Sequence, residues 1–148
     1  MESLKALFSN YVLVVAVTGW MTAQVLKTLL TLITTREFKA ERLTGAGGMP
    51  SAHSAAVCGL TVAMARSQGV DDPLFALSFL FAAVVMYDAM GVRRAAGEQA
   101  KTINDIVKHH EHTDVNTKEV LKESLGHTPL EVLAGALLGI LIAMLIPV

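Results

Sequence analysis

Two histidines in this chain lie where a polar turn meets an apolar segment. His53 follows the glycine-rich stretch 47–50, and His127 follows Gly126. A neutral imidazole can attack phosphorus to give a phosphohistidine, and a second histidine can protonate the leaving oxygen. If the fold brings the two histidines together, their chemistry would be nucleophilic attack on a phosphate group, assisted by a general acid.

The turn before His53 has the features of a helix start that attracts anions. Pro50 suits the first helical position, and Ser51 or Ser54 can cap the free backbone N–H groups. These N–H groups and the positive end of the helix attract phosphate-like groups. We therefore assign Gly48 and Ser51 to phosphate binding. An ordinary loop and helix start give the same pattern, so the assignment depends on the second histidine.

Glu131 follows His127 by four residues, which places both on one helical face. Its carboxylate could accept the Nδ1 proton of His127 and leave the other ring nitrogen free to attack. In the alternative, residues 128–131 form a capping box and the carboxylate closes the helix start. Both interpretations stay open, and we expect the histidine partnership.

Four apolar runs would have to position these residues. The chain is 53% hydrophobic with a mean hydropathy of +0.51. Charged residues are nearly absent from 8–35, 43–65, 73–92 and 128–148. Each run approaches the roughly 20 residues that cross a bilayer core of about 30 Å. We predict an all-α fold, a membrane-embedded bundle of about four transmembrane helices that forms a single integral membrane domain over residues 1–148. A bundle of buried soluble helices is the alternative.

The connection 92–125 is predicted to contain a surface helix. Residues 95–108 have helical composition, with Ile103, Ile106 and Val107 at apolar spacing. The stretch 109–114 that follows is rich in histidine but lacks the helical His-Glu-x-x-His spacing. We predict neither a metal site nor a cofactor.

Lysine and arginine are concentrated in 36–42 and 92–125. An even number of crossings separates these connections, so they share one side of the membrane. The positive-inside rule places both in the cytoplasm and both termini outside. We therefore expect an integral protein of the plasma membrane with its site on the cytoplasmic face. A net charge of −1 and the lack of a basic stripe argue against a nucleic-acid partner.

Two motifs resemble those of a known superfamily. The stretch 50–53, Pro-Ser-Ala-His, resembles the Pro-Ser-Gly-His motif of the type 2 phosphatidic acid phosphatase and vanadium-dependent haloperoxidase superfamily, and His127-x-x-x-Glu131 resembles its His-x-x-x-Asp motif. Stretches 47–54 and 87–94 together resemble the divergent small-membrane-protein branch. The resemblance implies metal-independent hydrolysis of a phosphomonoester or pyrophosphate on a lipid. It makes His127 the nucleophile, Glu131 its orienting carboxylate and His53 the general acid.

The chain departs from this superfamily in its phosphate-binding motifs. No counterpart of Lys-x6-Arg-Pro is present, because Lys27 is followed seven residues later by Thr34. The arginine of the Ser-Arg element before the last histidine is replaced by Leu121. Other residues must hold the phosphate if the site binds one.

Arg93 and Arg94 are the predicted substitutes, because they follow the third apolar run and lie near Asp88. A carboxylate near the membrane boundary is costly unless it is paired, so Asp88 is expected to pair with one of them. Arginines in this position can also serve only as topological anchors.

Two classes of function remain. One is a lipid-phosphate phosphatase that forms a phosphohistidine; the other is a non-catalytic membrane protein that binds or moves a phosphorylated lipid in the same pocket. The missing arginine motifs favour the second class, whereas the two histidines favour the first, and we expect the enzyme. Four short helices bury little surface, so a homodimer embedded among membrane lipids would be unsurprising.

Overall fold

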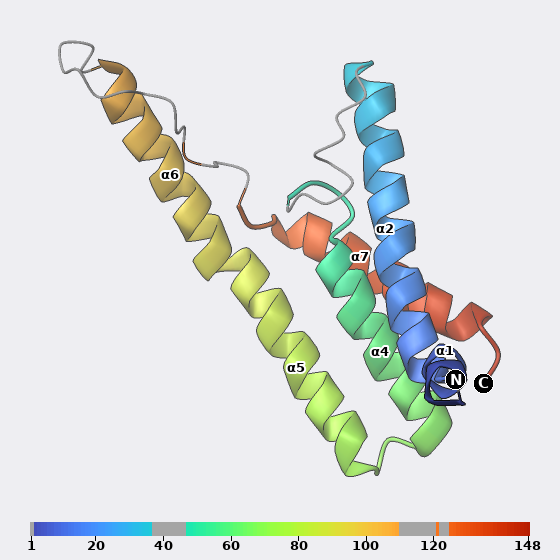
Figure 1. The fold of residues 1–148 in the computed structure, drawn as a ribbon. Coiled ribbons are helices and arrows are strands. Elements are labelled where there is room, and N and C mark those ends of the chain that lie inside the picture. The colour runs from blue at the N-terminus through green and yellow to red at the C-terminus, as the bar shows by residue number, and fades with distance from the viewer. Residues whose placement is uncertain (1, 37–46, 110–120, 122–124) are drawn as a thin grey trace.

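The computed structural model describes residues 2–36, 47–109, 121 and 125–148. These residues form only helices, joined by turns, and no strand occurs among them (Figure 1). The helices are α1 (Glu2–Phe8), α2 (Tyr11–Thr35), α4 (Ala52–Gln68), α5 (Pro73–Met90), α6 (Val92–His109) and α7 (Pro129–Leu145). Helices α2, α4, α5 and α7 match the four apolar runs, so the prediction of an all-α bundle is confirmed.

Capping side chains set where the four apolar helices begin. Asn10, Ser51, Asp72 and Thr128 each have extended backbone and accept a hydrogen bond from an N–H of the following turn. Each side chain thereby satisfies a donor that would otherwise be free. Pro50 precedes the Ser51 cap, so the prediction that Pro50 opens the helix is wrong.

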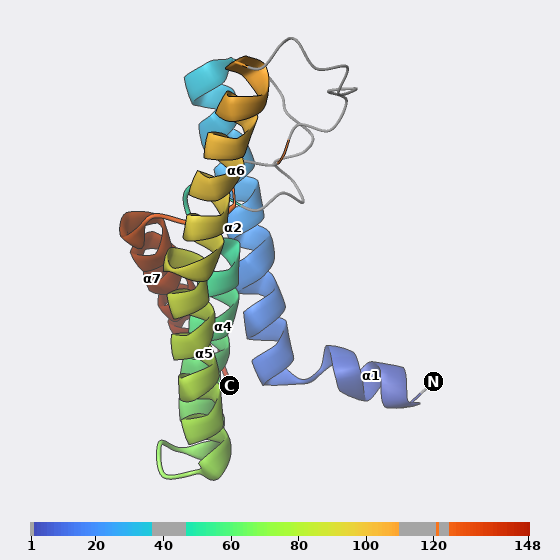
Figure 2. The ribbon, with the colours of Figure 1, turned by 90° about the vertical axis from the view of Figure 1, so that its left-hand side faces the viewer.

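The bundle is of the membrane type. Among the described residues, two helical stretches have the length and composition to cross a bilayer, Tyr11–Thr35 and Pro73–His109. The second comprises α5 and α6, which run nearly in one line in both views (Figures 1 and 2). Helix α7 is apolar but has 17 residues, a length of roughly 25 Å at 1.5 Å per residue. Helix α1 turns away from the bundle (Figure 2).

Helix α4 is the centre of the bundle and packs against α2, α5 and α7. Its contact with α7 depends on glycine. A methyl group at Gly135 would collide with the carbonyl oxygen of Ser51, and one at Gly139 would collide with that of Ala55. The two backbones are therefore in direct contact, as small residues allow in membrane helices. This contact fixes the start of α7 beside the start of α4.

An arginine joins the other end of α4 to α7. The Arg66 guanidinium donates hydrogen bonds to the carbonyl oxygens of Ala143 and Ile146 and to the hydroxyl of Tyr11. The two carbonyls belong to the last turn of α7 and to its C-cap residue, where no intrahelical donor remains. Helix α7 is thus held against α4 at both ends.

The predicted surface helix is α6. It extends beyond the bundle along the line of α5, and most of its side chains are exposed. Its buried residues are Gly97, Ala100 and Asn104. The Asn104 amide exchanges two hydrogen bonds with the backbone of Leu121, at 2.8 and 3.0 Å. One face of α6 therefore contacts the connection that leads to α7 at Leu121.

Candidate functional site

A cavity of about 440 Å³ lies at the end of the bundle where α4 and α7 begin. This volume falls in the range of about 300–1,000 Å³ that is typical of small-molecule sites. Three segments form its wall: the turn before α4, the first turns of α6, and the segment that enters α7. The lining residues are Gly47, Gly48, Arg94, Gly97, Glu98, Lys101, Leu125, Gly126, His127, Thr128 and Glu131.

His127 is the chemically notable residue of this wall. Its side chain is only 4% exposed, and neither ring nitrogen has a hydrogen-bond partner among the described residues. The backbone N–H of His127 donates to the carbonyl of Ala89 at 2.9 Å, which ties the residue to the end of α5. Buried polar atoms are normally satisfied, so an unsatisfied imidazole at a cavity wall suggests that a ligand completes it.

The surroundings keep this imidazole neutral. Burial is the largest cause that lowers the pKa of His127; the nearby carboxylate of Glu131 acts in the opposite direction, and the positive charges of Lys27 and Arg93 lower the pKa further. An unperturbed histidine has a pKa of about 6.5, so a lowered value leaves the ring uncharged at pH 7. Only the neutral ring has a free nitrogen lone pair for attack.

Gly126 brings the His127 segment into contact with α6. Its φ angle is +86°, and a methyl group there would collide with the backbone of Arg94. Only glycine combines this conformation with this approach at little cost. The glycine therefore places His127 and Arg94 on the same cavity.

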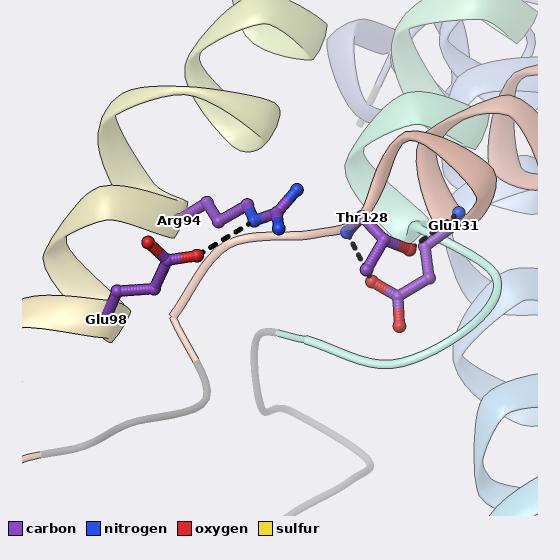
Figure 3. A network of polar contacts seen from close by, with 4 residues as sticks. All are labelled: Arg94, Glu98, Thr128 and Glu131. Carbon is purple, nitrogen blue, oxygen red and sulfur yellow. Dashed lines mark hydrogen bonds and ion pairs between the residues drawn. The ribbon is translucent and has the colours of Figure 1, made fainter. Parts of the chain in front are cut away.

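Glu131 does not orient His127 in this structure. Its Oε2 accepts a hydrogen bond from the backbone N–H of Thr128 at 2.8 Å, and its own N–H donates to the Thr128 hydroxyl at 3.3 Å (Figure 3). This reciprocal pair is the capping box that the sequence left open as an alternative. The expected hydrogen bond between Glu131 and the His127 ring is absent, because the carboxylate faces the helix start instead.

Of the two residues predicted to bind phosphate in the turn before α4, only one lines the cavity. Gly48 lines the cavity, with a φ angle of +85°. Ser51 is fully buried and does not line the cavity. Its hydroxyl accepts from the N–H and the hydroxyl of Ser54, and its own N–H donates to the carbonyl of Glu131 at 3.0 Å. Ser51 thus caps α4 and ties it to α7.

Of the two arginines predicted to bind phosphate, only one lines the cavity. Arg93 pairs with Asp88 through its Nε at 2.5 Å and does not line the cavity, so Asp88 has the arginine partner expected of it. Arg94 lines the cavity and extends from α6 toward the turn at Thr128, with its Nε 3.2 Å from Glu98 Oε1 (Figure 3). Arg94 is therefore the better placed of the two to bind an anion.

His53 lies on the first turn of α4 and is exposed. It does not line the cavity, but its charge acts on His127, and the charges of Lys27 and Arg93 act on His53. The fold thus brings the two histidines to one end of the bundle, one buried and one accessible.

Lys27 is the residue that the sequence interpretation missed. It lies on α2 with a side chain only 2% exposed, close enough to act on both histidines. Because no Arg-Pro follows it, the comparison with the superfamily motif gave it no role. A lone charge within the apolar run 8–35 was the available signal, since a charge at membrane depth is costly unless it has a function or a partner.

Fold and site together define a helical membrane protein with a histidine-containing cavity at one end of its bundle. A model of the Divergent PAP2 family matches residues 8–142, and the chain belongs to that family. It is 39% identical over 151 residues to the "Uncharacterized membrane protein YuiD" of Bacillus subtilis (strain 168), covering 95% of this chain and 96% of the relative. No solved structure matches the chain. The resemblance drawn from the two histidine motifs is confirmed.

Proposed function

We propose that this protein is a lipid-phosphate phosphatase that needs no metal and works through a phosphohistidine on His127. Membership of the divergent PAP2 family supports a phosphatase-like relation. The observation that carries the proposal is the buried His127 ring at the wall of a cavity of about 440 Å³, because neither of its nitrogens has a hydrogen-bond partner in the part of the chain that the structure describes. Two helical stretches have the length and composition to cross a bilayer, which supports a cavity within reach of a lipid headgroup.

The reaction proceeds in two balanced steps. A ring nitrogen of His127 attacks phosphorus, the bond from phosphorus to the lipid oxygen breaks, and His53 gives that oxygen a proton. Water then attacks the phosphohistidine, phosphate leaves, and the proton that the water loses passes to the solvent, from which His53 is protonated again. The accessible position of His53 suits this exchange with water.

Cationic and backbone groups around the cavity would hold the phosphate oxygens. Arg94 offers a planar fork of N–H donors, and Gly48 allows the backbone to approach closely. The buried charge of Lys27 lies within reach of both histidines electrostatically and would stabilise the charge that develops in the transition state. Arg93 contributes to the same field while it stays paired with Asp88.

One observation favours the second candidate, a membrane protein that binds or moves a phosphorylated lipid without cleaving it. The carboxylate of Glu131 is part of the capping box, so no carboxylate among the described residues hydrogen-bonds to His127 and fixes its tautomer. In hydrolases that use histidine, such a carboxylate commonly orients and stabilises the ring. A binding protein needs no such partner.

Phosphate release separates the two candidates. The purified protein in detergent is assayed without added metal on a panel of lipid monophosphates and diphosphates, alongside His127→Ala and the control His109→Ala. His109 is an exposed histidine at the end of α6, away from the cavity. We expect release by the wild type and by His109→Ala, and none by His127→Ala. If the wild type binds these lipids but releases no phosphate, the binding protein is the correct description.

A further inference from the structure

The ion pair on the first turns of α6 bears on how Arg94 meets a ligand. Arg94 Nε lies 3.2 Å from Glu98 Oε1, one helical turn further along, and both side chains line the cavity (Figure 3). No other hydrogen bond or ion pair of the Arg94 side chain occurs within the described residues. The two terminal nitrogens of the guanidinium therefore remain as donors.

This arrangement leaves the useful edge of the guanidinium open. Arginine binds phosphate best when two parallel N–H groups reach two oxygens, and the edge made by the two terminal nitrogens offers such a fork. A carboxylate that accepts from Nε fixes the plane of the guanidinium and leaves the two terminal nitrogens available to a ligand. Figure 3 shows Arg94 extending from α6 toward the turn of Thr128, which follows directly after His127.

We propose that Glu98 is a positioning residue that presents the terminal fork of Arg94 to the phosphate beside His127. This inference rests on the proposed function, because it needs a phosphate in the cavity. Half of the Arg94 side chain is exposed, 49%, and without a partner it would lose more rotamer freedom on binding. Glu98 removes part of that loss before the ligand arrives.

A carboxylate beside an anion site has an opposite effect as well. Its negative charge repels phosphate and competes with it for Arg94, so a purely competitive Glu98 would weaken binding. If Glu98 positions Arg94, loss of the Glu98 side chain weakens phosphate binding. If Glu98 only competes with phosphate, the same loss strengthens binding. Glutamine separates them further, because its amide oxygen can still accept from Nε but carries no charge.

The test measures binding of orthovanadate to the intact protein in detergent by titration calorimetry. The variants are Glu98→Ala, Glu98→Gln, Arg94→Ala and the double variant Glu98→Ala with Arg94→Ala. Asp105→Ala is the matched control, because Asp105 lies seven residues after Glu98 on the same exposed helix and does not line the cavity. It removes the same charge at a distance from the site.

We expect Glu98→Ala to raise the dissociation constant of vanadate roughly twofold to fivefold, the range that an exposed ion pair allows. Glu98→Gln should bind at least as tightly as the wild type, and Asp105→Ala should be unchanged. In the Arg94→Ala background, Glu98→Ala should not change the dissociation constant of vanadate further, because Glu98 affects binding only by positioning Arg94.

Other results overturn the proposal in distinguishable ways. Unchanged or tighter binding by Glu98→Ala, no recovery with glutamine, or an equal loss in the Arg94→Ala background would each reject positioning while vanadate binding by the wild type leaves the proposed function standing. No binding by the wild type would reject the phosphate site itself, and the role of Glu98 with it.

Discussion

At the scale of single residues, the site is defined by which polar groups are satisfied. Glu131 and Thr128 hydrogen-bond to each other at the start of α7, whereas no described residue hydrogen-bonds to the ring of His127. Glu131 follows His127 by four residues. At that spacing its carboxylate can reach either the ring of His127 or the free backbone N–H groups of the helix start, so both interpretations were open from the sequence. In the structure the carboxylate accepts a hydrogen bond from the backbone, because the first N–H groups of a helix have no partner within the helix.

The capping role gives Glu131 a testable consequence. Glu131→Gln keeps an oxygen that can accept from the Thr128 N–H, so we expect turnover near that of the wild type. Thr128→Ala removes the cap and should lower stability by about 1 kcal/mol, measured as the thermal midpoint in detergent. A loss of turnover of about 10² to 10⁴ in Glu131→Gln, with stability unchanged, would show instead that the carboxylate serves His127 during the reaction.

At the scale of elements, the glycines of α7 decide where His127 lies. The apolar runs were enough to predict α2, α4, α5 and α7. The sequence could not predict that α7 packs backbone to backbone on α4, because that contact depends on which face of each helix carries its small residues in three dimensions. Ser51 was assigned to the ligand for the same reason, since its contact with the start of α7 depends on that packing.

Gly139→Ala tests this packing. A methyl group there would collide with the carbonyl oxygen of Ala55, and overpacking typically costs about 1–3 kcal/mol. We expect a lowered thermal midpoint and a weakened site, because the start of α7 would shift from α4. Leu141→Ala, at an exposed position of the same helix, is the control and should change the midpoint less. Equal midpoints for Gly139→Ala and the wild type would contradict the close contact.

At the scale of the whole molecule, the two histidine segments, α6 and the end of α2 lie at one end of the bundle, and the turn between α4 and α5 lies at the other (Figure 1). Hydropathy was enough to predict this arrangement, because an even number of spans returns the chain to the same side. The side of the membrane, the membrane of residence and a homodimer stay predictions. The histidine-rich stretch 110–114 and most of the basic connection 36–42 lie outside the described residues.

Cysteine labelling tests the orientation. In a Cys58→Ala background, Lys101→Cys on α6 should resist a membrane-impermeant thiol reagent added to intact cells, whereas Val70→Cys in the turn between α4 and α5 should react. Both positions are exposed, so accessibility within the protein does not limit the reaction. Reaction at position 101 from outside would reverse the predicted orientation and move the site to the outer face.

The central claim is that His127 and His53 have different tasks, and phosphate release by two variants on two substrates tests it most directly. One substrate is a lipid phosphate and the other an aryl phosphate whose phenol is acidic enough to leave with little protonation. His127→Ala should release no phosphate from either substrate, because no phosphohistidine can form. His53→Ala should lose activity on the lipid and keep most of its activity on the aryl phosphate. Full activity of His127→Ala, or equal loss by His53→Ala on both substrates, would contradict the account.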